Sequence, residues 1–274
     1  MPLPSGVQVI LSRMKEVGTY LQQQIAPYDP QQVLCLFDID MTLLQPDHPA
    51  TYLPNVRQHE DLYHAIQKQY PEQDVSLTFA FNFLLPQRVV DPDVYDVLQN
   101  LSVKTISLTA TLTGDFLGTR MEVRRYEHLK ENNFSFENTF PQSEIILYQC
   151  PCYRGNYPVF YKGILLSNSE RGNTTKGTVL CAFLQTIGWT PQCVLLVDDR
   201  VKNHADMEEA LQTTFPQTRY VGIEFTGAEN YCPQPISAAD FQAFWSHRFE
   251  QANRLPYSHT QKTIDSEDWF KLPQ

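Results

Sequence analysis

Two aspartates separated by one residue, Asp38 and Asp40, directly follow the apolar run at residues 33–36. A short apolar run that ends in carboxylates is typical of a buried parallel strand followed by a polar loop. Two acids at a strand tip are unfavourable unless their repulsion and partial desolvation are offset, and a divalent cation with a phosphate-bearing substrate would offset them. The spacing suits Asp38 as a carboxylate nucleophile and Asp40 as general acid and then general base. The alternative is a turn in which Asp and Thr cap backbone groups.

Further positions carry residue types suited to the same chemistry. Thr109 lies near the end of a β-prone stretch, residues 103–111. Lys176 opens an amphipathic helix that stops at Gly188, and a cation there opposes the helix dipole, so helix propensity does not explain it. A solvated surface lysine is the alternative.

A second buried-strand pattern, residues 194–197, ends in the adjacent acids Asp198 and Asp199. Adjacent carboxylates supply hard oxygen ligands suited to Mg²⁺. Because successive strand residues point in opposite directions, the two acids are expected to play different roles.

The pattern Asp38-x-Asp40-x-Thr42 resembles the first motif of the haloacid dehalogenase (HAD) superfamily of phosphatases and phosphotransferases. Thr109, Lys176 and the Asp198–Asp199 pair are similar to the later motifs of that superfamily and follow in its order. The resemblance implies that Thr109 hydrogen-bonds a phosphoryl oxygen. It also implies that Lys176 neutralises the nucleophile and the transferring phosphoryl group.

The same resemblance implies a Mg²⁺ ion bound by Asp199, by the Asp38 carboxylate and by the backbone carbonyl of Asp40. Asp198 would orient Lys176 or hold a metal-bound water. Thr42 and Asn203 would contact these metal ligands without touching the metal ion.

One position departs from the HAD pattern. Met41 stands where many relatives carry glycine, which predicts that this turn does not need a positive φ there.

Strands that alternate with helices predict an α/β fold with a doubly wound parallel sheet, similar to the HAD-like Rossmannoid fold. We expect one HAD-like domain over residues 1–274, with modest cap insertions at about 45–98 and 112–172. The motif order, with an aromatic-Lys-Gly-Ile-Leu segment at Tyr161–Leu165, is similar to a poorly characterised bacterial HAD-like family of unknown substrate.

Periodicity and turn residues place the elements. We expect helices from the N-terminus to about residue 26 and over residues 60–70, 91–100, 115–130, 176–187, 205–212 and 237–251. We expect strands before Asp38 and Asp198 and over residues 75–83, 103–111, 160–166 and 220–223. Asp91 and Ser237 are the expected N-caps of their helices.

Composition narrows the class of protein. The formal net charge is −10 and no basic cluster stands out, which argues against a nucleic acid as partner. No stretch reaches the roughly 20 apolar residues of a membrane span, and the N-terminus lacks a signal-peptide core, which predicts a cytoplasmic protein, with delivery into a host cell as an alternative. The six cysteines are scattered and favour buried reduced thiols over a zinc site.

Together these patterns predict a Mg²⁺-dependent phosphomonoester hydrolase that acts through an aspartyl-phosphate on a phosphorylated small molecule or side chain. The alternatives are a catalytically silent binding or scaffold protein and a phosphotransferase. The loop-rich intervals favour a partly open site lined by Phe79, Phe81 and Tyr153. Arg120, Arg124 and Arg125 are candidate substrate contacts, although a solvated helix face is the favoured interpretation of these three.

Overall fold

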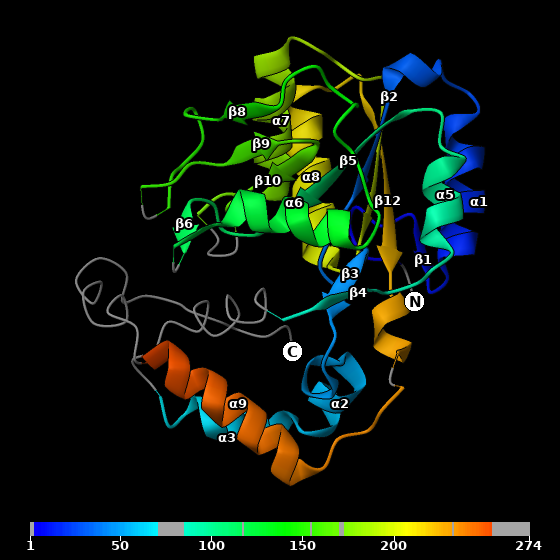
Figure 1. Cartoon of the computed structure of the whole chain (residues 1–274). Coiled ribbons are helices and arrows are strands. Elements are labelled where there is room, and N and C mark those ends of the chain that lie inside the picture. The colour runs from blue at the N-terminus through cyan, green and yellow to red at the C-terminus, as the bar shows by residue number, and fades with distance from the viewer. Residues whose placement is uncertain are drawn as a thin grey trace. The chain divides into compact units, whose positions relative to one another are not determined.

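The computed structural model describes residues 3–70, 85–116, 118–153, 155–169, 173–231 and 233–253 (Figure 1). The chain divides into two compact units, residues 1–45 with 89–228, and residues 46–88 with 229–274. Most of the expected insertion at 45–98 belongs to the second unit, whereas the insertion at 112–172 belongs to the first. The expectation of a single domain over the whole chain stays a prediction.

The first unit is built on a mostly parallel sheet. Among the described residues its strands lie in the order β1-β12-β11-β2-β5-β10-β9-β8. Their bounds are β1 Val9–Leu11, β2 Val33–Phe37, β5 Lys104–Thr109, β8 Glu144–Ile146, β9 Val159–Tyr161, β10 Ile164–Leu166, β11 Cys193–Asp198 and β12 Arg219–Phe225. Neighbouring strands from β1 to β10 in this order are parallel. β9 is antiparallel to both of its neighbours, β10 and β8.

The strand order reverses at β2. After β2, the chain adds β5 and β10 on one side of it and then β11 and β12 on the other. This mixed α/β arrangement is consistent with a doubly wound fold, in which sites form at the carboxyl ends of the strands where the order reverses.

Helices cover both faces of this sheet. In Figure 1, α1 (Met14–Ile25) and α5 (Val94–Gln99) lie together on one side, and α7 (Lys176–Ile187) and α8 (Val201–Thr214) lie on the other. Gly177 lets α7 approach α8, because a Cβ there would lie 2.8 Å from that of Ala210. The helix α6 (Met121–Glu131) follows the short hairpin of β6 (Asp115–Phe116) and β7 (Thr119–Arg120).

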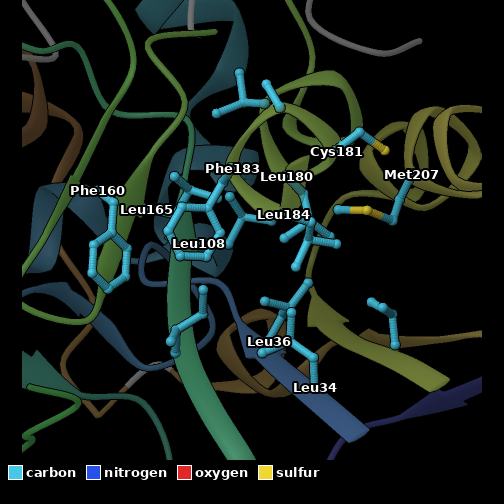
Figure 2. Close-up of a cluster of buried hydrophobic side chains, with 14 of the residues drawn as sticks. Leu34, Leu36, Leu108, Phe160, Leu165, Leu180, Cys181, Phe183, Leu184 and Met207 are labelled. Atoms are coloured by element: carbon cyan, nitrogen blue, oxygen red, sulfur yellow. The ribbon is translucent and has the colours of Figure 1, made fainter. Parts of the chain in front are cut away.

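The main core lies between the sheet and the pair α7 and α8 (Figure 2). Leu34 and Leu36 point into it from β2, as the two-residue period of a strand requires. They pack with Leu108, Leu165 and Phe183. All five residues of β2 are buried, which agrees with the continuous apolar run of a central parallel strand.

Several expected elements differ in the structure. Residues 9–11 form β1, parallel to β12, and the first helix begins only at Met14, because Asp91 Oδ2 accepts the Met14 N–H at 2.7 Å. Asp91 thus contacts the start of α1 through Oδ2, while its Oδ1 accepts the Asp93 N–H at 3.0 Å in the turn before the helix expected at 91–100, which begins at Val94. The helix expected at 115–130 begins at Met121.

The strand expected at 160–166 is the hairpin of β9 and β10. Lys162 and Gly163 form its turn with φ of +47° and +82°, the left-handed backbone of a two-residue hairpin loop. The strand expected at 75–83 lies outside the described residues.

The second unit contains η2 (Pro49–Thr51), α2 (Leu53–Gln58), α3 (Glu60–Gln67) and α9 (Ala238–Asn253). Phe241, Trp245 and Phe249 of α9 pack with Tyr63 and Ile66 of α3. The indole N–H of Trp245 donates to the Ala50 carbonyl at 3.0 Å. Ser237 Oγ accepts the Asp240 N–H at 3.1 Å, which confirms the predicted N-cap.

Three short elements lie where the chain passes from one unit to the other in sequence: β3 (Leu44–Pro46), which pairs with β4 (Gln87–Val89), and η3 (Gly227–Asn230), which precedes α9. The remaining short element, η1 (Pro30–Gln32), leads into β2. In the part of the chain that the structure describes, no helix is both long and apolar enough to cross a membrane.

Candidate active site

The carboxyl ends of β2 and β11 bring three aspartates together. Asp38 follows β2, Asp198 ends β11 and Asp199 comes next. The two strands are parallel neighbours, and the Asp38 N–H donates to the Val197 carbonyl at 2.9 Å. One carboxylate oxygen of each aspartate lies within 4.8 Å of the others. These acids therefore meet at the point where the strand order reverses.

Lys176 joins this cluster from the first turn of α7. Its ammonium lies 2.8 Å from Asp38 Oδ1 and 2.7 Å from Asp198 Oδ2, and its side chain is only 1% exposed. Thr175 caps α7 by accepting the Thr178 N–H at 3.1 Å. The two ion pairs explain why a lysine opens a helix whose dipole disfavours it, and they contradict the alternative of a solvated surface lysine.

Asp198 is held by several donors. Its Oδ1 accepts the Arg200 N–H at 2.9 Å, and Asn203 Nδ2 donates to Oδ1 at 2.8 Å and to Oδ2 at 3.0 Å. Asn203, expected only to support the metal ligands, thus contacts Asp198 directly. Asp198 Oδ2 also accepts from Lys176 Nζ at 2.7 Å, the contact that the first of its two expected roles requires, and the choice between the two roles stays a prediction.

His204, which the sequence analysis did not single out, supports the same strand end. Its Nε2 lies 3.2 Å from the Asp198 backbone oxygen, and its Nδ1 lies 2.8 Å from the Tyr220 hydroxyl. Because a carbonyl only accepts, Nε2 carries the proton and Nδ1 accepts from Tyr220. Burial lowers the pKa of His204, which favours this neutral form.

The second aspartate of the motif, Asp40, contacts a different set of residues. Thr109 Oγ1 donates to Asp40 Oδ2 at 3.4 Å and lies 2.8 Å from Thr111 Oγ1. The guanidinium of Arg125, from α6, forms an ion pair with the same Asp40 oxygen. Thr111 and Arg125 are thus additional residues of the site. Arg125 is completely buried, so the solvated-face interpretation is wrong for this residue.

The other two arginines of the candidate set bind acids away from Asp40. Arg120 forms ion pairs with Glu122 and Glu144, and Arg124 pairs with Glu127 and Glu131. Their side chains are 43% and 22% exposed.

Met41 has a φ of +60°, so the prediction that this turn avoids a positive φ was wrong. The turn forces this backbone: Met41 N–H donates to the Leu44 carbonyl at 2.8 Å, and Leu43 and Leu44 both donate to the Ile39 carbonyl. A non-glycine residue in the left-handed region costs about 1–2 kcal/mol. The backbone strain is therefore at Met41, directly after Asp40.

The charges of the cluster are unbalanced. Burial raises the pKa of Asp38 above its ordinary value and the pKa of Asp199 to about 7, and the neighbouring Asp198 adds to both effects. Burial also acts on Asp198, but the charge of Lys176 and the hydrogen bonds outweigh it and lower its pKa. If all are ionised, three carboxylates and one ammonium leave two negative charges, which one divalent cation would neutralise.

The donor set suits a hard cation. Asp199 Oδ1 is buried and has no hydrogen-bond partner among the described residues, which leaves an oxygen for a ligand. Carboxylate oxygens are the ligands of Mg²⁺ and Ca²⁺. The cluster of Asp38, Asp198 and Asp199 could therefore hold a metal ion.

Thr42 and the expected lining residue Tyr153 lie in the described part of the chain. Thr42 is buried beside the motif, and within the described residues its Oγ1 has no hydrogen-bond partner. Tyr153 lies in a turn closed by two backbone hydrogen bonds with Asn156. Phe79 and Phe81 lie outside the described residues, so the partly open site stays a prediction.

Comparison with known proteins gives a family without an assigned activity. The signature of the family described as protein of unknown function (DUF2608) matches residues 11–267. The chain belongs to this family. Uncharacterized proteins of Rickettsia felis and Rickettsia conorii are similar to it, at 25% and 24% identity over 66% and 60% of this chain. A Rickettsia bellii protein is 22% identical over 76% of the chain and 73% of its own length.

For the first two relatives, the matched region spans 62% and 55% of their length. No solved structure matches this DUF2608 protein.

Proposed function

We propose that this protein is a Mg²⁺-dependent phosphomonoester hydrolase of the HAD type that acts through an aspartyl-phosphate on Asp38. The observation that carries the proposal is the buried cluster of Lys176 with Asp38, Asp198 and Asp199 at the reversal point of the sheet. Buried ions of this kind cost desolvation energy that well-packed apolar residues would avoid. Their presence together at one strand edge therefore favours a chemical role.

The donors around Asp38 support its role as nucleophile. Lys176 Nζ and the Ile39 N–H, at 2.8 Å each, both contact Oδ1. This arrangement holds the carboxylate in one orientation and leaves Oδ2 for attack. Asp40, two residues further, is 37% exposed at its side chain and is reachable by a leaving group.

In the first step, an Asp38 oxygen attacks phosphorus and the ester P–O bond breaks. Asp40 gives a proton to the departing oxygen. In the second step, water attacks the phosphorus of the aspartyl-phosphate and Asp40 accepts its proton. The acyl P–O bond then breaks, which releases phosphate and restores the Asp38 carboxylate.

Charge neutralisation accounts for most of the catalysis expected in phosphoryl transfer. Lys176 supplies one fixed positive charge next to Asp38. Asp199, the Asp38 carboxylate and the Asp40 carbonyl would hold Mg²⁺, which supplies the remaining positive charge when bound. Asp198 keeps the Lys176 ammonium in place.

Turnover of 4-nitrophenyl phosphate with Mg²⁺ tests the proposal. We expect Asp38→Asn to remove activity, and excess EDTA to remove it from the unchanged protein. Asp93→Asn, an exposed acid of the same unit, is the control and should retain activity. Wild-type turnover in Asp38→Asn would disprove the nucleophile. A folded protein that turns over no sugar phosphate, nucleotide or phosphopeptide would favour the scaffold alternative.

A further inference from the structure

Arg125 reaches the site from outside the four motifs. It lies on α6, and its side chain is 0% exposed, whereas Arg120 and Arg124 of the same segment are 43% and 22% exposed. Met121 and Leu129, one turn before and after Arg125, are buried as well. Arg125 thus lies on the inner face of its helix.

Arg125, Asp40 and two threonines form a closed ring of hydrogen bonds. Arg125 Nη2 donates to Asp40 Oδ2, and Arg125 Nε donates to Thr111 Oγ1 at 3.0 Å. Thr111 Oγ1 lies 2.8 Å from Thr109 Oγ1, which donates to Asp40 Oδ2 at 3.4 Å.

The direction of these hydrogen bonds is fixed by chemistry. A guanidinium only donates, so Asp40 Oδ2 accepts from it whether or not the other oxygen, Oδ1, carries a proton. Thr111 therefore accepts from Arg125 and donates to Thr109, which in turn donates to Asp40. Both routes end on Oδ2, so Oδ1 is the oxygen of Asp40 that remains for proton transfer.

We infer that Arg125 is a positioning residue that holds Asp40 in the orientation from which it transfers protons. The inference rests on the proposed function. Asp40 lies on a tight turn next to the positive φ of Met41, and Arg125 and Thr109 are the donors that hold its Oδ2 there. Because Arg125 is buried behind Asp40, it acts through this carboxylate rather than by touching substrate.

Proton transfer matters most for a poor leaving group, because 4-nitrophenolate departs without a proton and an alkoxide does not. The test compares kcat/KM for 4-nitrophenyl phosphate and 2-phenylethyl phosphate, because kcat/KM reports the steps up to the aspartyl-phosphate and not its hydrolysis, which both esters share. A misplaced acid costs about 100-fold in rate. We therefore expect Arg125→Met to lower kcat/KM about 100-fold for the alkyl ester and less than about 10-fold for the aryl ester.

Two comparisons sharpen the test. Arg124→Met, the neighbouring arginine that pairs only with Glu127 and Glu131 in the ion pairs described above, should behave as wild type on both esters. Asp40→Asn should show the same preference for the aryl ester as Arg125→Met. Adding Arg125→Met to Asp40→Asn should then cause no further selective loss.

Equal losses of kcat/KM on the two esters would overturn the inference while the proposed function stands. An unchanged protein that is folded but hydrolyses neither ester would overturn the proposed function, and this inference with it. If Arg125→Met does not fold, Arg125→Lys replaces it in the test. A lysine keeps the charge but has no counterpart of Nε, so it should give the same selective loss on the alkyl ester to a smaller extent.

Discussion

At the scale of single residues, the clustered aspartates of the site outnumber the cations that contact them. Lys176 contacts two of the three clustered aspartates, and Asp199 Oδ1 has no donor among the described residues. Coulomb repulsion and desolvation both disfavour the ionised forms of Asp38 and Asp199. The stability of the metal-free protein should therefore depend on pH in a defined direction.

Between about pH 4 and pH 7, the folded protein holds a proton on Asp199 that the unfolded chain has lost, because its pKa is raised from 3.8 to about 7. The free energy of unfolding should therefore fall as pH rises through this window, by roughly 4 kcal/mol, and level off above it. Asp38 adds to this trend. Asp198, whose pKa is lowered, acts in the opposite direction only below about pH 4.

Urea unfolding at pH 5, 6, 7 and 8 measures this dependence. Mg²⁺ should stabilise the protein more at pH 8 than at pH 5, because only the ionised acids bind it. Asp199→Asn should lose the part of the pH dependence that Asp199 causes and keep the part due to Asp38, whereas Asp93→Asn should keep all of it. A pH dependence that is the same in Asp199→Asn would show that another group causes it.

At the scale of elements, the sequence predicted those parts that have a strong local signal. The central strands β2 and β11 are continuous apolar runs that end in acids, and Gly188 ends α7 in the left-handed conformation. Lys176 and the acids could be placed together because parallel strands share one carboxyl edge.

The missed elements depend on partners that are remote in sequence. β1 has three residues and pairs with β12, more than 200 positions away, so no local period marks it as a strand. Arg125 follows Met121 by one helical turn and precedes Leu129 by another, which is a signal of burial, but its charge favoured solvent. The Lys162–Gly163 turn could have been recognised, because a glycine between two β-prone runs is typical of a hairpin.

The β9–β10 hairpin depends on Gly163. Its φ is +82°, and a Cβ at this position would collide with the Phe136 backbone carbonyl. We expect Gly163→Ala to lower the free energy of unfolding by about 3 kcal/mol or more, since backbone strain and a backbone collision add. Gly188→Ala is the control: its φ is +65° and nothing lies within 4 Å, so it should cost only about 1 kcal/mol. Equal effects in urea unfolding would contradict the collision.

At the scale of the whole molecule, all residues assigned to the site belong to the first unit, residues 1–45 with 89–228. The second unit has a core of its own around α3 and α9. An acidic chain of net charge −10 can still bind a phosphate ester, because Lys176 and bound Mg²⁺ act locally.

This division predicts that a substitution can destabilise the second unit without changing the activity of the site in the first unit. Phe241 is completely buried in the second unit, and Phe241→Ala should destabilise that unit by about 3–5 kcal/mol. Unfolding followed by tryptophan fluorescence should report the change, since Trp245 packs against Phe241. The kcat for 4-nitrophenyl phosphate, measured where the variant is folded, should stay within about threefold of wild type. A much larger loss would mean that the second unit contributes to catalysis.

The central claim is a covalent phosphoryl group on Asp38, and borohydride trapping tests it most directly. Borohydride reduces an acyl phosphate to an alcohol, so an aspartyl-phosphate becomes homoserine, which peptide mass spectrometry can locate. Asp40→Asn, mixed with 4-nitrophenyl phosphate and Mg²⁺, should accumulate the intermediate because its hydrolysis lacks a general base. We predict homoserine at position 38 only when substrate and Mg²⁺ are both present. Turnover with unmodified Asp38, or with the label at another residue, would contradict the account.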